Sequence, residues 1–353
     1  MNSFTLVDVA RVTMRTVAER VGVSPMTVSN AFSRPDQLSA ALRERILAAA
    51  AELGYVGPDP AARTLARGTT GTVGILVTDS LHYVFTDVFS ATFLASIAEE
   101  LAGKGLALTI LPPEGTGTVV PTRDVAMDAA IVYACGVDAE GLGWLRKRGL
   151  PLVQVDQPAD PTVTSINIED RAGARAAAQH VVDLGHRRVA VLVVGEGDPL
   201  DDSGNHQEQR MLGWLDALAP VGVKPVVVHC SVSAEDAAFD AVGPLLAGPD
   251  RPTALLCFSD ALAAGALRAA RDAGLDVPAD LTVVGFDDSP LAQRTNPPLT
   301  TVRQDAAGKG RVTAAALVDA LDRRRAGRPQ QVEHIVLPTE LVVRSSSAAP
   351  KAR

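Results

Sequence analysis

Cysteine is scarce in this chain of 353 residues, and long apolar runs are missing. Cys135, Cys230 and Cys257 lie far apart and form no C-x-x-C pair. This spacing excludes a disulfide framework and a cysteine-rich zinc site, and it fits a reducing cytosol. Because no apolar run reaches about 18 residues, we expect no membrane span and a cytoplasmic protein. A basic segment followed by an apolar one is also missing at the start, so we expect no secretory signal.

The motifs of common doubly wound enzymes are absent as well. No G-x-x-x-x-G-K-[ST] loop occurs, and Lys309 lacks the upstream glycine of such a phosphate site. No G-x-S-x-G elbow occurs either. Gly195 and Gly197 begin a dinucleotide fingerprint whose third glycine is missing. His206 and Glu208 form no metal set, and we interpret both as a solvated loop or a pocket rim. We therefore expect no enzyme, no metal and no cofactor.

Charge is distributed unevenly along the chain. The formal net charge is −8. Residues 1–68 contain eight arginines, no lysine and six acidic residues, so this segment carries about +2 and the remainder about −10. A small basic segment joined to a large acidic one is the asymmetry expected of a DNA-binding domain attached to another domain. The length predicts two or three domains, and 47% hydrophobic with 21% charged residues is ordinary for a globular protein.

Residues 13–56 show the pattern of three short helices. Thr13, Ser24 and Ser39 are suited to cap the three N-termini, and Gly22 and Gly54 to end the first and third helices. Apolar residues recur at helical spacing between these caps. Two short helices joined by a turn with glycine form a helix-turn-helix. This pattern alone leaves open a three-helix bundle with no role in nucleic-acid binding.

The second of these helices has the side chains that a major groove requires. A helix N-terminus and nearby hydroxyl groups donate to phosphate oxygens. Asn30 can bond to base edges, and Met26 can contact a thymine methyl group. The outward-facing and capping residues that we expect at DNA are Ser24, Pro25, Met26, Thr27, Ser29 and Asn30.

Residues 57–70 form a short segment between the head and the rest of the chain. Glycine and proline at 57–60 end the third helix, and residues 61–66 have helical composition but span barely two turns. Such a short helix is not stable alone in water. The segment is either a flexible linker or a hinge that folds on DNA and inserts Leu65 between base steps from the minor groove.

From residue 71 on, strand and helix patterns alternate, which predicts parallel sheets covered on both faces. The two successive sets indicate two similar subdomains with a ligand cleft at the carboxyl ends of the strands. The apolar runs lie at 73–77, 107–111, 129–133, 152–155, 189–194, 226–229, 255–258 and 281–285. The helical patterns lie at about 88–102, 138–148, 171–183, 205–218, 234–246 and 260–273.

Polar and aromatic residues near the predicted strand ends are candidates for this cleft. Carboxylates accept hydrogen bonds from sugar hydroxyls, arginine donates a fork of N–H groups, and an aromatic ring stacks on an apolar face. Two of the candidates have plain alternatives, since Asp260 could cap its helix and Asp287 could be a turn residue. The candidates are Phe89, Ser90, Asp156, Gln157, Arg210, Asp260 and Asp287.

The head and hinge resemble those of the LacI/GalR family of bacterial repressors. The motifs V-A-x-x-x-G-V-S-x-x-T-V-S at 17–29 and A-A-R-x-L-A at 61–66 carry this resemblance. The resemblance implies base-reading positions at Pro25, Met26 and Asn30, and a minor-groove lever at Leu65 with Ala62 beside it. It implies phosphate contacts from Ser24, Thr27, Ser29 and Tyr55. Residues 1–12 precede the usual start and have no assigned role.

The remaining chain resembles the periplasmic-binding-protein fold that LacI-type regulators use for effector binding and dimerisation. L-G-H-R-R-V-A-V-L at 184–192, R-P-T-A-L-L-C-F-S-D-A-L-A-A-G-A at 251–266, V-V-G-F-D-D-S at 283–289 and L-T-T-V-R-Q at 299–304 carry this resemblance. It implies effector contacts from Arg210, Asp260 and Asp287, and pocket-lining positions for Phe89, Ser90, Asp156 and Gln157. Residues 112–128 depart from the family pattern, because prolines and glycines replace the usual second helix. The tail lacks a heptad repeat, so we expect no tetramerisation coil.

We therefore expect an α/β chain with an all-α helix-turn-helix headpiece at 13–56, a hinge at 57–70 and a two-subdomain body at 71–344. The implied function is that of a homodimeric transcriptional regulator, by family default a repressor, on double-stranded operator DNA. We expect a sugar or nucleoside-like effector, bound between the two subdomains of the body, to control its operator binding. A secreted solute-binding protein is the alternative for the body, but such a protein has no helix-turn-helix. The sequence identifies neither the effector nor the operator, nor whether the effector releases or promotes DNA binding.

Overall fold

The computed structural model describes residues 12–77, 81–112, 118–133, 140–200 and 205–351. The chain forms two compact units that divide between Thr70 and Gly71. This division coincides with the predicted end of the hinge. We call the first unit the headpiece, with its hinge, and the second the body.

The headpiece consists of the three predicted helices, α1 (Met14–Val21), α2 (Pro25–Ser33) and α3 (Ala40–Leu53), with a 3-10 turn at Pro35–Gln37. The predicted caps are confirmed. The Ser24 hydroxyl accepts from the Thr27 N–H at 3.1 Å, and the Ser39 hydroxyl accepts from the Leu42 N–H. Gly22 and Gly54 end their helices in the left-handed conformation that glycine adopts without strain.

One small apolar cluster holds the three helices together. Val17 and Ala18 of α1, Val28 and Ala31 of α2, and Ile46 of α3 are fully or almost fully buried in it. Each helix therefore contributes one face, as the apolar spacing predicted.

The hinge contains helix α4 (Pro60–Arg67), which is capped at both ends. The Asp59 carboxylate accepts from the backbone N–H of Ala61 at 2.8 Å, and Gly68 ends the helix at a φ of 67°. Leu65 is 88% exposed on this helix. Good caps explain how so short a segment forms a helix, although they do not change its low intrinsic stability.

The body contains two six-stranded sheets. The first has the order β11-β5-β4-β3-β1-β2 and is parallel throughout. The second has the order β12-β10-β9-β8-β6-β7 and is parallel except for β12, which runs antiparallel to β10. The strands are β1 (Thr72–Val77), β2 (Ala107–Leu111), β3 (Ala129–Tyr133), β4 (Leu152–Val155), β5 (Thr164–Ile168), β6 (Val189–Val194), β7 (Val226–Cys230), β8 (Ala254–Cys257), β9 (Thr282–Asp287), β10 (Thr300–Arg303), β11 (His334–Leu337) and β12 (Glu340–Val342).

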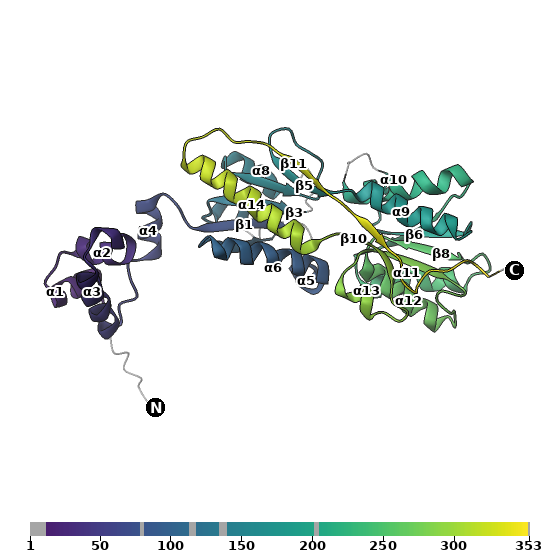
Figure 1. Ribbon diagram of the computed structural model, residues 1–353, viewed down its shortest axis with the longest axis horizontal. Coiled ribbons are helices and arrows are strands. Elements are labelled where there is room, and N and C mark those ends of the chain that lie inside the picture. Colours follow the sequence, from purple (N-terminus) through teal and green to yellow (C-terminus); the bar gives the residue numbers. More distant parts are fainter. Residues whose placement is uncertain (1–11, 78–80, 113–117, 134–139, 201–204, 352–353) are drawn as a thin grey trace, which may run out of the picture. The chain divides into compact units, whose positions relative to one another are not determined.

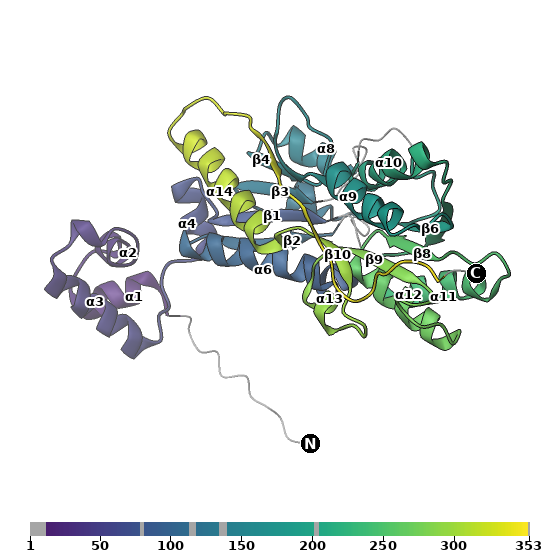
Figure 2. The ribbon, with the colours of Figure 1, turned by 45° about the vertical axis from the view of Figure 1, so that its right-hand side comes forward.

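Helices cover both faces of each sheet (Figures 1 and 2). In the first subdomain, α6 and α14 lie side by side on one face, and α7 and α8 cover the other. In the second, α9 and α10 cover one face and α11 and α12 the other. The helices of the body are α5 (Leu81–Thr86), α6 (Val88–Gly103), α7 (Pro121–Asp124), α8 (Glu140–Lys147), α9 (Asp170–Asp183), α10 (His206–Leu218), α11 (Glu235–Ala247), α12 (Asp260–Asp272), α13 (Pro290–Arg294) and α14 (Ala306–Arg325).

The chain passes between the two sheets three times. It leaves the first sheet after β5, returns to it after β10 through α14, and crosses again between β11 and β12. The expectation of two successive sets is therefore incomplete, because each subdomain is built from separate stretches of sequence. At 112–128, where prolines and glycines were expected to replace the family's usual helix, the structure has only the single turn α7. Residues 113–117 lie outside the described ranges.

The packing of the body continues beyond its predicted end at residue 344. Ser346 is fully buried, and its hydroxyl donates to the Val283 carbonyl at 2.6 Å. His186 is hydrogen-bonded to the Ala348 carbonyl at 2.9 Å. The tail is thus part of the second subdomain.

Candidate DNA-binding surface and effector cleft

The residues predicted to contact DNA gather at the N-terminal half of α2. Met26 is 69% exposed, and Ser24 and Pro25 are exposed beside it. Thr27, like Ser29, is half-buried, and its hydroxyl lies 2.8 Å from that of Ser24. The structure thus brings the exposed apolar side chain of Met26 and several hydroxyl groups to one helix end.

Asn30 lies half-buried one turn further along α2. Its side-chain amide donates to the Gln37 side-chain carbonyl at 3.1 Å. This bond fixes the orientation of the amide and leaves its own carbonyl oxygen as an acceptor. A base edge would therefore meet an oriented side chain instead of a freely rotating one.

The remaining predicted DNA contacts lie after α3. Tyr55 packs edge-on against Phe32, with ring centroids 5.7 Å apart. Burial raises the pKa of the Tyr55 hydroxyl, and the nearby Arg63 opposes this shift. The hydroxyl therefore stays a donor at neutral pH. Ala62 and Leu65 are exposed on α4.

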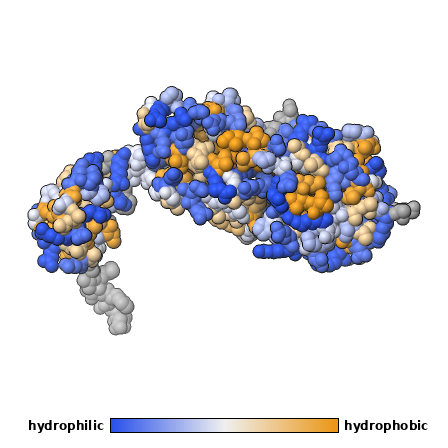
Figure 3. All heavy atoms as spheres, viewed as in Figure 1, coloured by the Kyte–Doolittle hydropathy of each residue, from blue (hydrophilic) through white to orange (hydrophobic). Residues whose placement is uncertain are grey.

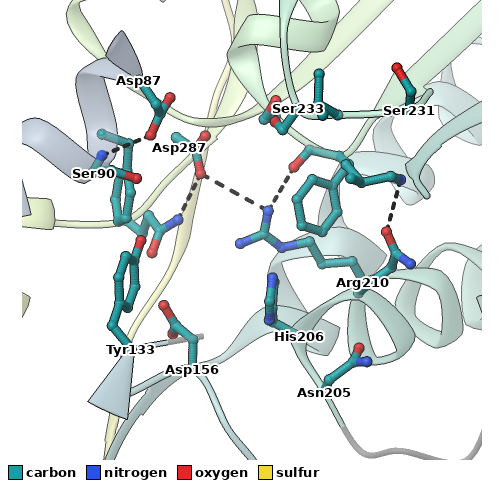
Figure 4. A pocket seen from close by; sticks show the side chains of 17 residues that line it. Asp87, Ser90, Tyr133, Asp156, Asn205, His206, Arg210, Ser231, Ser233 and Asp287 are labelled. Atoms are coloured by element: carbon teal, nitrogen blue, oxygen red, sulfur yellow. Dashed lines mark hydrogen bonds and ion pairs between the residues drawn. The ribbon is translucent and has the colours of Figure 1, made fainter. Parts of the chain in front are cut away.

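The body contains a cavity of about 360 Å³ between its two sheets (Figure 4). It lies at the carboxyl ends of the strands, where parallel sheets bind ligands. Among the predicted effector residues, Phe89, Ser90, Asp156, Arg210 and Asp287 line it. The other lining residues are Asp87, Tyr133, Val194, Asn205, His206, Gln207, Ser231, Val232, Ser233, Phe258, Ser259 and Gln304.

Arg210 is 4% exposed and lies at the centre of the second subdomain's wall. Its Nε donates to Asp170 Oδ1 at 2.8 Å, and its Nη1 donates to the Phe258 carbonyl at 2.6 Å. The guanidinium carbon lies 3.6 Å from the ring centroid of Phe286. Burial raises the pKa of Asp170, and the charge of Arg210 opposes that shift. The guanidinium is thus oriented by groups of the protein itself.

Asp287 ends β9 in an unusual backbone conformation, with a φ of 117°. Non-glycine residues rarely adopt such a value, and positions of this kind cluster at binding sites. Its Oδ1 accepts from the Gln304 amide at 2.7 Å and lies 4.0 Å from Arg210 Nη1. Burial raises the pKa of Asp287 well above its ordinary range. The carboxyl group faces the cavity from the second subdomain.

Asp156 faces the cavity from the first subdomain, directly after β4. Its backbone is left-handed, with a φ of 55°. Both of its carboxylate oxygens accept from Lys309 Nζ, at 2.5 and 2.6 Å. This carboxylate therefore also reaches the cavity already paired with a cation.

Two predicted effector residues lie outside the lining of this cavity. Asp260 is buried at the start of α12, where Ser259 provides the N-cap that was considered for Asp260. Its carboxylate accepts from the Ser289 N–H at 2.7 Å and from the Thr301 hydroxyl at 2.6 Å, and burial raises its pKa to about 7. It borders a smaller neighbouring cavity of about 190 Å³.

Gln157 is the second such residue. It is buried, its backbone N–H donates to the Asn167 side chain at 3.1 Å, and its own amide atoms have no hydrogen-bond partner among the described residues. Asp260 and Gln157 are thus both buried outside the lining of this cavity, and their roles as effector contacts stay predictions.

The sequence patterns missed several residues that line the cleft, among them Tyr133, Phe258 and Gln304. Of the two interpretations of His206, the pocket rim agrees with the structure, because this residue lines the cavity. The solvated loop is wrong, because His206 is the first residue of α10 and its ring lies 5.5 Å from that of Phe258. Burial lowers the pKa of His206, which favours the neutral ring. Glu208 is also buried within α10. The N-cap residue Asn205, directly before them, is the signal that marks the helix start.

Within the described residues, no helix is long and apolar enough to cross a membrane, and no group of three or more metal-ligating side chains comes together.

Comparisons with known proteins match both units of the chain. Residues 13–57 match the family model of bacterial regulatory proteins, lacI family, and residues 178–347 match a periplasmic binding protein-like domain. An HTH-type transcriptional regulator of Mycobacterium tuberculosis is 38% identical, over 97% of this chain and 98% of that protein. The HTH-type transcriptional regulator IpsA of Corynebacterium glutamicum is 33% identical, over 88% of this chain and 92% of that protein.

Solved structures agree with these matches. The lac repressor dimer bound to operator and the anti-inducer ONPF is similar with a TM-score of 0.78 and 27% identity, over 96% of this chain and 99% of that one. The complex of the transcriptional regulator CelR with cellobiose has a TM-score of 0.68 and 28% identity, over 95% of this chain and all of that one. With a helix-turn-helix headpiece, a two-sheet body and relatives that match nearly end to end, the chain belongs to the LacI family of DNA-binding bacterial transcriptional regulators.

Proposed function

We propose that this regulator is a repressor whose operator binding is controlled by an uncharged, hydroxyl-rich molecule, a sugar or a nucleoside, bound in the cleft. The observation that carries this proposal is the chemistry of the cavity. Carboxylates lie on both walls of the cavity, at Asp156 and Asp287. The rings of Phe89 and Phe258 line it as well. Carboxylates accept from hydroxyl groups, and ring faces cover the apolar C–H face of a sugar or a base.

The ion pairs around the cavity favour an uncharged ligand. Arg210 is the one guanidinium or ammonium group among the described lining residues. Two of its N–H groups donate to Asp170 and to the Phe258 carbonyl, and the Asp170 carboxylate already balances its charge. A phosphate would therefore enter a site whose one described cation is paired with a carboxylate, beside further carboxylates. A neutral polyol needs no such partner.

One structural relative binds a ligand of this chemical kind. CelR is described in complex with cellobiose. At 28% identity this relative supports a sugar-like effector as a class and does not select one compound for this chain.

On the DNA side, we infer that Pro25, Met26 and Asn30 contact base edges, with Leu65 entering the minor groove. The residues inferred to contact phosphates or to support the lever are Ser24, Thr27, Ser29, Tyr55 and Ala62. One headpiece offers few contacts, so specific binding requires a homodimer on an operator with two-fold symmetry. Apolar patches on a largely hydrophilic surface of the body are compatible with a subunit contact (Figure 3).

A thermal-shift experiment on the full chain tests the effector class. The probes are D-glucose, D-ribose, cellobiose, adenosine and D-glucose 6-phosphate, each at millimolar concentration. A ligand at about 100 times its dissociation constant stabilises the folded state by about 2.7 kcal/mol. We expect a raised Tm with an uncharged compound and none with the phosphate. A rise with the phosphate alone would contradict the proposal.

The regulatory role needs a second experiment. Operator sequences are selected from random double-stranded DNA with the full chain, and binding is then measured with and without the compound that raises Tm. A reporter gene placed behind the selected operator shows repression or activation. Increased reporter expression in the presence of the regulator would contradict a repressor.

A further inference from the structure

Lys309 is buried where lysine is rarely found. It lies in the first turn of α14, directly after the chain crosses from the second sheet to the first, and it is 1% exposed. An ammonium group away from water is costly unless it is paired and hydrogen-bonded. The position therefore demands specific partners, and the sequence motifs gave this lysine no role.

The partners of Lys309 lie on both sides of the crossing. Its Nζ donates to both carboxylate oxygens of Asp156, which follows β4 of the first sheet. It also lies 3.4 Å from the side-chain oxygen of Gln304, which follows β10 of the second sheet. Lys309 itself is not among the residues that line the cavity. Asp156 does line the cavity, so Lys309 pairs with a cavity-lining carboxylate without lining the cavity itself.

The contacts continue into the opposite wall. The Gln304 amide donates to Asp287 at 2.7 Å, and Asp287 lies 4.0 Å from Arg210. One unbroken series of polar contacts thus joins Asp156 in the first subdomain to Arg210 in the second, and Lys309 is its link at the crossing. Two of the residues of this series that line the cavity have a positive φ. They are Asp156, with a left-handed backbone, and Asp287.

We propose that Lys309 is a positioning residue that fixes the arrangement of the two subdomains in the effector-free regulator, by tying Asp156 to Gln304 and Asp287. This inference rests on the proposed function in one respect, namely that the cleft is the effector site. An effector whose hydroxyls bind Asp156 and Asp287 then acts directly on the two ends of the link, and through it on the subdomain arrangement.

The test measures the distance between the subdomains without any effector. Spin labels are attached at Glu100→Cys in α6 and Asp240→Cys in α11, both exposed, in full-length protein that also carries Cys135→Ser. Labelled chains are mixed with an excess of unlabelled chains, so that the two labels of one chain dominate the signal. The remaining cysteines, Cys230 and Cys257, are buried. Distance distributions are compared for the parent, Lys309→Met, Lys309→Arg and the control Lys224→Met at an exposed lysine.

We expect Lys309→Met to shift or broaden the distribution, Lys309→Arg to restore it in part, and Lys224→Met to leave it unchanged. A tenfold change in the ratio of two arrangements corresponds to about 1.4 kcal/mol, within reach of one charge-assisted hydrogen bond. An unchanged distribution in Lys309→Met would overturn the proposal.

A second variant separates positioning from the mere cost of an unpaired buried charge. Asp156→Asn/Lys309→Met removes both charges, and asparagine tolerates the left-handed backbone. We expect this double variant to recover the Tm lost by Lys309→Met and to keep the altered distribution. Recovery of the parent distribution would overturn the proposal, because the lysine would then only neutralise Asp156. If Lys309→Met does not fold, the comparison of the double variant's distance distribution with that of the parent tests the proposal by itself. Since no sugar is present, these outcomes do not depend on the effector class.

Discussion

The headpiece and the body present their candidate sites in opposite ways. In the headpiece, the residues inferred to read DNA are neighbours in sequence and point outward from one helix, while a separate apolar cluster stabilises the fold. In the body, the cleft residues come from positions as far apart as Asp87 and Gln304, and most of them are buried or half-buried. The binding residues of the headpiece can therefore be changed without disturbing its fold, whereas those of the cleft cannot.

This difference follows from what each site binds. DNA is large and approaches from outside, so its contacts need exposure and local order. A small molecule must be surrounded, so its contacts lie in the interior, where each charge needs a partner. Substitutions in the two regions should consequently affect stability and binding in different proportions.

The largest expected effect is the loss of Arg210. Arg210→Ala leaves the buried Asp170 without its cation, a change that typically costs about 3–5 kcal/mol of unfolding free energy. Met26→Ala at an exposed site of the headpiece should change stability by less than about 0.5 kcal/mol. Urea unfolding of the full chain, followed separately for the two units, measures both.

A matched control tests the cause of this loss. Arg210→Met combined with Asp170→Leu removes both charges, and it should recover most of the stability that the single variant loses. If Arg210→Ala is as stable as the parent, the cleft residues, like those of the headpiece surface, can be changed without disturbing the fold.

The same contrast explains what could be predicted from the sequence. The three headpiece helices follow from local signals, since Thr13, Ser24 and Ser39 each cap a helix in the structure as expected. Most body strands were also predicted, because buried parallel strands are continuous apolar runs. β5 was missed because polar residues interrupt its short run of Thr164–Ile168.

The cleft network could not be predicted in this way. Lys309 and Asp156 are separated by more than 150 positions, and nothing local in the sequence marks them as partners. The long helix α14 was missed as well. Because Lys309 lies in its first turn, the place of this lysine in the fold could not be predicted either. Family resemblance identified Arg210 and Asp287 as cleft residues, but not the protein groups that already occupy them.

The next effect in size concerns the hinge, whose helix is exposed like the headpiece site but is expected to order fully only on DNA. Leu65→Gly removes the apolar wedge and weakens α4. Unstacking of a base step costs a few kcal/mol, which the wedge contacts must offset. We expect a sharp loss of specific operator affinity and of DNA bending, with salt-dependent non-specific binding largely kept. Affinities on operator and random DNA, with the bend angle, measure this. Unchanged bending would mean that the segment is a linker.

A smaller effect should separate stability from recognition within α2 itself. Ser24→Ala removes the N-cap and should cost about 1 kcal/mol of headpiece stability. Met26→Ala should leave stability unchanged and reduce the discrimination at one base pair, where a mismatch typically costs about 1–3 kcal/mol. Headpiece unfolding and binding to operators with single base changes distinguish the two. Equal stability losses would show that the exposed surface and the fold are coupled here too.

The smallest expected effect is the dependence of stability on pH, and it is confined to the body because all six histidines lie beyond residue 71. Burial lowers the pKa of His180, His186 and His206. Below about pH 6.5 the unfolded chain binds protons that these folded histidines do not, so their contribution to stability falls as the pH falls. Buried carboxyl groups act in the opposite direction, because burial raises the pKa of Asp170 and Asp287 and raises that of Asp260 to about 7. The folded body keeps a proton that the unfolded chain releases above about pH 4, so this contribution to stability rises as the pH falls from 7 to 5. The histidines and the buried carboxyl groups therefore act against each other in the parent.

Asp260→Asn removes part of the carboxyl contribution, so its body should lose more stability than the parent between pH 7 and 5, with the headpiece unchanged. Urea unfolding at pH 7, 6 and 5 checks this, and equal losses in variant and parent would mean that Asp260 is ionised in the folded body throughout that range.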